Sequence, residues 1–95
     1  MASTKDFRNF ILEQLHSLNV TDRYMMSEYI LYYNGVIFGG IYDDRLLVKK
    51  TETNKKYNME EVIPYENAKP LYYVTDVDNI DLLKEIVIST YEGLK

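Results

Sequence analysis

The chain has 95 residues, of which 46% are hydrophobic and 27% charged, and we expect one globular domain, residues 1–95. Fifteen acidic and eleven basic side chains give a net charge of −4, the wrong sign for a protein whose main partner is a nucleic acid. There is no cysteine, which excludes a disulfide scaffold, a thiolate metal site and a cysteine nucleophile.

No targeting or membrane-spanning segment is predicted. The first residues are polar and lead into no apolar signal core. The longest stretch without a charge, from Tyr29 to Tyr42, has 14 residues, fewer than the roughly 20 that cross a bilayer. We therefore expect a cytoplasmic protein.

The first predicted element is an amphipathic helix. Ser3 or Thr4 is placed to cap it, and Asp6 lies in its first turn, where a negative charge favours the helix dipole. Apolar residues then recur every three or four positions, which predicts one buried face: Phe7, Phe10, Ile11, Leu15 and Leu18.

A β-meander follows the helix. Asn34-Gly35 is a strong signal for a two-residue hairpin turn, and Asp43-Asp44 is a weaker one. The predicted strands are about 29–33, 36–42 and 45–50, preceded by a short strand near 24–26. The register that such turns impose pairs Tyr33 with Val36, Leu31 with Phe38, Tyr42 with Arg45, and Ile41 with Leu46.

Directly opposed residues share a face, so this register predicts the two faces of the sheet. The predicted core face is uncharged: Ile30, Tyr32, Ile37, Gly39, Ile41, Leu46 and Val48. The other face is aromatic, aliphatic and basic: Tyr29, Leu31, Tyr33, Val36, Phe38, Gly40, Tyr42, Arg45, Leu47 and Lys49.

The rest of the chain completes the fold prediction. Asn58 and Glu61 form a capping box for a short helical piece, and residues 71–75 favour a fifth strand. Asp78 caps a last helix with one apolar stripe: Leu82, Leu83, Ile86, Val87, Thr90 and Leu94. The predicted class is α+β, an antiparallel meander of about five strands with an N-terminal and a C-terminal helix packed on the sheet.

No residue pattern predicts catalysis. His16 is the only imidazole, and its place near the end of the first helix suits a structural role. Asp43 and Asp44 are predicted turn formers, because adjacent strand residues point to opposite faces. Gly39-Gly40 is followed by no helix start, so it indicates a bulge or close packing rather than a phosphate loop. We predict no enzyme, no cofactor and no metal.

Two binding hypotheses remain. The chain has ten tyrosines, and tyrosine is enriched at protein interfaces, so the second face predicts a protein partner or a homodimer. The candidate interaction residues are Tyr29, Leu31, Tyr33, Phe38, Tyr42, Arg45 and Lys49. The alternative is a small-ligand or anion-binding domain, or an enzyme of unknown type, that uses Arg23 and Lys49. Direct nucleic-acid binding fits the acidic charge poorly.

The placement of the helices decides whether the second face is accessible. If they lie on opposite sides of the sheet, each covers one face. If both pack on the uncharged face, the aromatic face is left for a partner. We favour the second arrangement, because Arg45 and Lys49 would be hard to cover with a helix.

The run from Val20 to Lys49, VTDRYMMSEYILYYNGVIFGGIYDDRLLVK, resembles the core motif of the TfoX N-terminal domain family, bacterial proteins named after a regulator of natural competence. The matching positions are Arg23, Met25, Tyr29, Tyr33, Gly35, Phe38, Asp43, Asp44, Arg45, Leu46 and Lys49, with Pro70 and Tyr73 later. Where the family has a glycine-rich stretch, this chain has Ser27, Glu28 and Ile30. The resemblance implies a single-domain regulatory or interaction module with no known catalytic residues.

Overall fold

The computed structural model describes residues 3–95 and contains two α-helices and one sheet. Helix α1 spans Lys5–Gln14 and helix α2 spans Ile80–Leu94. The strands between them are β1 (Val20–Met25), β2 (Glu28–Tyr33), β3 (Val36–Tyr42), β4 (Arg45–Val48), β5 (Glu60–Val62) and β6 (Leu71–Val74), with a 3₁₀ helix η1 (Lys55–Tyr57) before β5. They form one antiparallel sheet in the order β1-β2-β3-β4-β6-β5, which confirms the α+β class with one strand more than predicted.

Local signals define both helices. The Thr4 hydroxyl accepts a hydrogen bond from the backbone N–H of Phe7 at 3.2 Å and caps α1. Asn79, one residue after the predicted Asp78, caps α2 by accepting from the N–H of Leu82 at 3.1 Å. The buried residues of the helical region lie on the predicted stripes: Ile11, Leu15, Leu83, Ile86, Val87 and Thr90. Phe10, predicted on the buried face of the first helix, is instead 37% exposed, because it lies at the edge of that stripe.

Three two-residue turns connect the first four strands. Asn34-Gly35 and Asp43-Asp44 both have two positive φ angles, as a type I′ turn requires. Met26-Ser27 has the same geometry, with φ values of 53° and 70°, although neither residue favours it. The segment before α1 supports these turns, because the N–H of Ser3 donates to Ser27 O at 3.3 Å and the N–H of Thr4 donates to Asp44 Oδ1 at 2.7 Å.

A β-bulge in β3 changes the predicted register. Next to the turn, Tyr33 pairs with Val36 as predicted. The register then shifts by one residue between Tyr32 and Leu31, so Leu31 pairs with Gly39 and not with Phe38. A Cβ atom on Gly39 would clash with the carbonyl oxygen of Leu47, so the bulge needs a glycine here. A shift of one residue turns a strand's side chains to the other face of the sheet.

The predicted face assignments are therefore wrong for β2 and the start of β3. Ile30 and Tyr32, predicted as core, lie on the face opposite the core, and Ile37 is 39% exposed. The sheet residues that form the core are Tyr29, Leu31, Phe38, Ile41, Leu46, Val48, Tyr72 and Val74.

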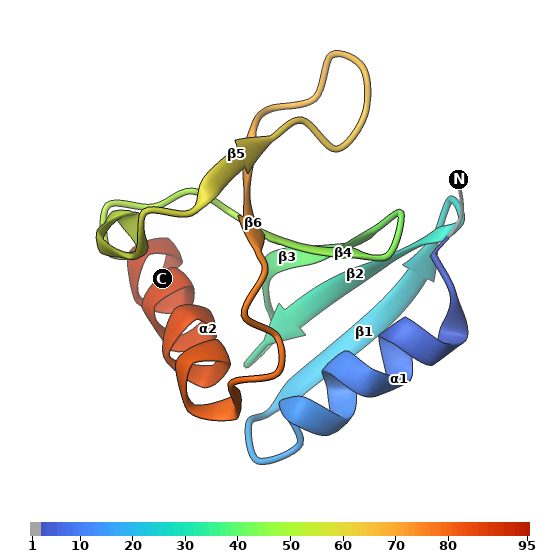
Figure 1. Ribbon diagram of the computed structural model, residues 1–95, viewed down its shortest axis with the longest axis horizontal. Coiled ribbons are helices and arrows are strands. Elements are labelled where there is room, and N and C mark those ends of the chain that lie inside the picture. Colours follow the sequence, from blue (N-terminus) through green and yellow to red (C-terminus); the bar gives the residue numbers. More distant parts are fainter. Residues whose placement is uncertain (1–2) are drawn as a thin grey trace.

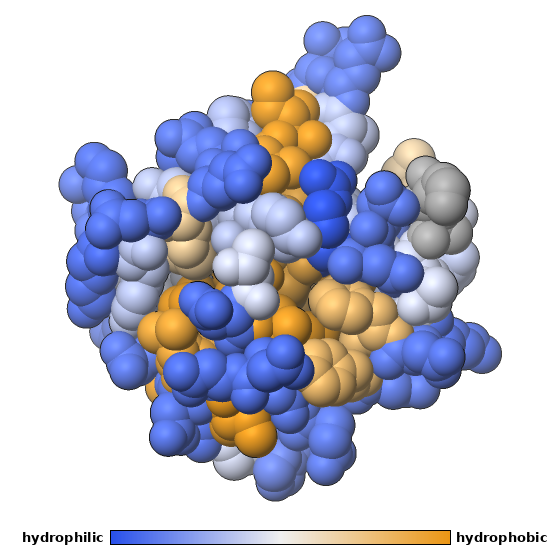
Figure 2. All heavy atoms as spheres, viewed as in Figure 1, coloured by the Kyte–Doolittle hydropathy of each residue, from blue (hydrophilic) through white to orange (hydrophobic). Residues whose placement is uncertain are grey.

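Both helices pack on this core face. Ile11 and Leu15 of the α1 region and Leu83 and Val87 of α2 join the same buried cluster, and Figure 1 shows the two helices on the same side of the curved sheet. In the same view, Figure 2 shows apolar side chains gathered between the helices within a mostly polar surface. The expectation that both helices share one side is confirmed, but the face they cover is the one that contains Tyr29 and Leu31.

The segment between β4 and β6 also differs from the prediction. Asn58 does not begin a helix; it ends η1 in the left-handed conformation with a φ of 53°, and β5 follows. The buried Asn54 ties this segment down, because its Nδ2 donates to the Lys49 carbonyl at 2.8 Å and to the Thr90 hydroxyl of α2 at 2.9 Å.

Candidate functional site

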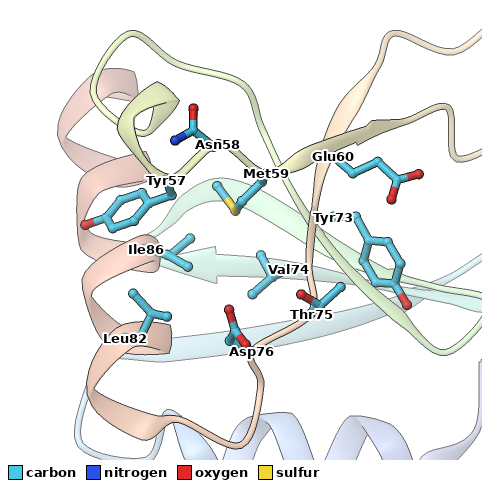
Figure 3. Close-up of a pocket in the computed structure, with 10 residues that line it drawn as sticks. All are labelled: Tyr57, Asn58, Met59, Glu60, Tyr73, Val74, Thr75, Asp76, Leu82 and Ile86. Atoms are coloured by element: carbon cyan, nitrogen blue, oxygen red, sulfur yellow. The ribbon is translucent and has the colours of Figure 1, made fainter.

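A cleft of about 240 Å³ opens beside the end of β6, past the point where its pairing with β5 stops (Figure 3). β5 begins at Glu60, opposite Tyr73, so Val74 and the residues that follow it have no strand on that side. The cleft lies between this part of β6, α2 and the link from η1 to β5. Its lining residues are Tyr57, Asn58, Met59, Glu60, Tyr73, Val74, Thr75, Asp76, Leu82 and Ile86.

The floor of the cleft is apolar. Val74 and Ile86 are 2% and 3% exposed, and Figure 3 shows them pointing toward Met59 and Leu82. The side chain of Tyr73 points the other way, toward the opposite side of the sheet, as does that of Glu60 (Figure 3).

The polar groups of the cleft are hydroxyls, carboxylates and one amide. The Tyr57 hydroxyl donates to a Glu85 carboxylate oxygen at 3.0 Å, which holds its ring against α2. Asp76 lies at the mouth, and the lining includes no lysine, arginine or histidine.

The opposite side of the sheet forms a second candidate surface, which we call the uncovered face. Strand pairing and the alternation of side chains place on it Arg23, Glu28, Ile30, Tyr32, Ile37, Tyr42, Arg45, Leu47, Lys49, Glu60 and Tyr73. Both helices pack on the other side of the sheet, but this face is not exposed throughout: Leu47 is fully buried, and the loop before β6 brings Tyr65 beside Tyr42. Of the seven predicted interaction residues, Tyr42, Arg45 and Lys49 lie here.

Tyr42 is a partly buried aromatic residue of the uncovered face. Its ring lies over Gly40, where a Cβ atom would approach it to 2.9 Å, and its centroid is 6.4 Å from that of Tyr65 in the loop before β6. Burial, then the nearby Tyr65 and Glu28, raises the pKa of the Tyr42 hydroxyl above its usual value. These surroundings therefore favour the neutral form of Tyr42.

The other four predicted interaction residues are not on this surface. Leu31 and Phe38 are fully buried, and Tyr29 is nearly so, in the core beneath the helices. Tyr33 is half-buried against α2, with its ring centroid 4.9 Å from that of Tyr91. The bulge explains the difference, because the prediction continued the turn register past Phe38 without a shift.

The surface residues that the prediction missed are Ile30, Tyr32 and Ile37. Alternation alone could not separate them from core residues, because both faces of β2 and β3 are apolar. The Gly39-Gly40 pair was the usable signal, since glycine inside a strand indicates a bulge.

Arg23 and Lys49, the predicted anion pair, share the uncovered face without forming one site. β2 and β3 lie between their strands, which separates the two backbones by about 14 Å at the usual strand spacing. Neither residue lines the cleft.

The remaining polar candidates have local roles. His16 is exposed, with Nδ1 2.9 Å from the carbonyl oxygen of Glu13. Asp44 accepts the hydrogen bond from Thr4, and both aspartates form the predicted turn. Within residues 3–95 no three metal-ligating side chains cluster together.

No model of a known protein family matches the chain, and no curated protein matches it in sequence. The resemblance to the TfoX N-terminal domain family stays a prediction. Over the described part of the chain, no helix is long and apolar enough to cross a membrane.

Proposed function

We propose that the protein is a non-enzymatic, cytoplasmic regulatory or interaction module that binds another protein through the uncovered face. The observation that carries this proposal is the one-sided packing of the sheet. Both helices cover the core face, and Ile37 remains 39% exposed beside the partly buried Ile30 and Tyr32.

The chemistry of the uncovered face suits a protein interface. Isoleucine and tyrosine side chains provide apolar contact area, and the hydroxyls tolerate a wet rim. Arg45 is half-buried, and its Nε donates to the Tyr42 carbonyl at 3.3 Å, so its guanidinium is partly ordered before any partner binds. Preordered side chains lose less entropy on binding.

The charge of this face favours an acidic protein partner. Arg23, Arg45 and Lys49 lie on it together with Glu28 and Glu60, so the face has a small excess of positive charge although the whole chain carries −4. In a homodimer with two-fold symmetry, any of these cations next to the axis would face its own copy, which is unfavourable. A nucleic acid is less well supported, because the net charge repels it.

The resemblance to the TfoX N-terminal domain family points the same way, since it implies a regulatory module. The alternative, a small-ligand function with Arg23 and Lys49, has weaker support because the two residues lie on separate strands.

Affinity purification from lysate of the cells that contain the protein tests this proposal with a matched pair of variants. Ile37→Glu and Phe10→Glu change residues that are 39% and 37% exposed, the first on the uncovered face and the second on α1. We expect wild type and Phe10→Glu to retain the same partner and Ile37→Glu to lose it, with unchanged circular dichroism in all three. Equal retention by all three, or no partner for wild type, would contradict the proposal.

A further inference from the structure

The two edges of the sheet differ in length. An edge strand presents unpaired N–H and C=O groups on which another strand can build. β5 offers three residues, whereas β1 offers six, all paired with β2 on its inner side. In Figure 1, β1 forms one margin of the sheet. Thr21, Arg23, Tyr24 and Met25 are exposed, so β1 is the accessible edge.

The alternation of bonded and non-bonded pairs between β1 and β2 shows which backbone N–H and C=O groups of β1 point away from the sheet. The two-residue turn makes Met25 and Glu28 a bonded pair, and every second pair after it is bonded as well. The N–H of Asn34 donates to the Asn19 carbonyl at 3.1 Å, in the same phase. The N–H and C=O groups of Asp22 and Tyr24 therefore face away from the sheet, and within residues 3–95 they have no hydrogen-bond partner.

A shallow depression of about 730 Å³ runs beside this edge on the helix side. It is lined by Ser3, Lys5, Arg8, Asp22, Tyr24 and Tyr29. Arg8 Nε donates to Asp22 at 2.7 Å, and the ring of Tyr24, 60% exposed, packs with its centroid 5.1 Å from that of Tyr29. Alternate side chains of an added strand would enter this depression, and the others would lie beside Arg23.

A second copy of the chain fits the edge poorly. If the β1 edges of two copies pair antiparallel, only two registers place both Asp22 and Tyr24 opposite residues of the other copy's β1. In one register Asp22 lies opposite Asp22, and in the other Arg23 lies opposite Arg23. Like charges directly opposite each other in a sheet are destabilising.

We propose that the free edge of β1 binds an extended segment of another protein, which adds to the sheet as a further strand and places an acidic side chain opposite Arg23. The flanking side chains of that segment are apolar or aromatic, since they pack on Tyr24 in the depression. Arg23 takes part in both proposals, but the outward N–H and C=O groups of β1 and the contacts of Ile37 in β3 are separate, so each proposal can fail without the other.

The test uses peptides selected from a random phage-displayed library on the full chain. Selected peptides should alternate apolar residues around a central Asp or Glu. In fluorescence titrations, Tyr24→Ala removes the ring but keeps the N–H, whereas Tyr24→Pro removes both, and proline is tolerated where its nitrogen faces off the sheet. We expect Tyr24→Pro to bind about tenfold more weakly than Tyr24→Ala, and Ile37→Glu to bind like wild type.

Amide exchange by NMR on the wild type keeps the test independent of how the variants fold. Bound peptide should slow exchange at the amides of Asp22 and Tyr24. Equal affinity of the two Tyr24 variants, selected peptides that are basic, or unchanged exchange at these amides would overturn the proposal. A library that yields no binder would overturn it too, as would a wild-type dimer, detected by light scattering, that Tyr24→Pro dissociates.

Discussion

Phe38 is the largest fully buried side chain of the core, and the bulge places it on the same face of the sheet as Ile41. We predict that Phe38→Ala lowers the free energy of unfolding by about 3 to 5 kcal/mol, through lost transfer energy and an unfilled cavity. Its exposed neighbour provides the control: Ile37→Ala should cost less than about 1 kcal/mol. Urea unfolding measures both, and the reverse ranking would show that the bulge is misplaced.

The raised pKa of the Tyr42 hydroxyl predicts a loss of folding stability at alkaline pH. Its pKa is raised in the folded protein, so above about pH 10 the unfolded state ionises first. The contribution of Tyr42 to the free energy of unfolding is complete below that pH, and it is lost as the pH rises through the pKa of the folded state. Between about pH 8 and pH 10.5, Tyr42→Phe should therefore lose less stability in urea unfolding than wild type. Tyr24→Phe, at an exposed ring, is the control, and an identical fall for Tyr42→Phe and wild type would refute the assignment.

At the scale of elements, the three hairpin turns differ in how well their residues suit positive φ. Gly35 has a φ of 80° and nothing within 4 Å of its Cβ position, so Gly35→Val should cost about 1 to 3 kcal/mol through backbone strain alone. Ser27 has a φ of 70° without being glycine, so Ser27→Gly should instead stabilise by about 0.5 to 1 kcal/mol. Thermal or urea unfolding gives both signs, and a neutral Gly35→Val would contradict the turn geometry.

The same elements show what the sequence could predict. The apolar stripes of the helices and the turn residues Asn34-Gly35 and Asp43-Asp44 are local signals, and both helices and both turns could be predicted from them. The Met26-Ser27 turn carries no such signal; strand pairing and the bond from Ser3 hold it in place. β5 has the sequence Glu-Glu-Val, a weak strand former, and it exists because β6 offers it an edge.

For the whole molecule, the decisive feature is that both helices share one side of the sheet. The sequence favoured this arrangement, because basic residues on one face are hard to cover. It could not fix which residues of β2 and β3 end on that face, since a single extra residue in a bulge reverses the assignment. Three of the predicted interaction residues therefore lie on the uncovered face, whereas the other four lie in the core or against α2.

The uncovered face as the interaction surface is the central claim, and site-specific photo-crosslinking tests it most directly. A photoreactive phenylalanine analogue would replace Ile37 or, separately, Phe10, positions of similar exposure on opposite sides of the molecule. Irradiation in the cells that contain the protein should give one discrete crosslinked partner, heavier than the chain and different from it, from position 37 and none from position 10. Crosslinks from position 10 alone, or from neither position, would contradict the account.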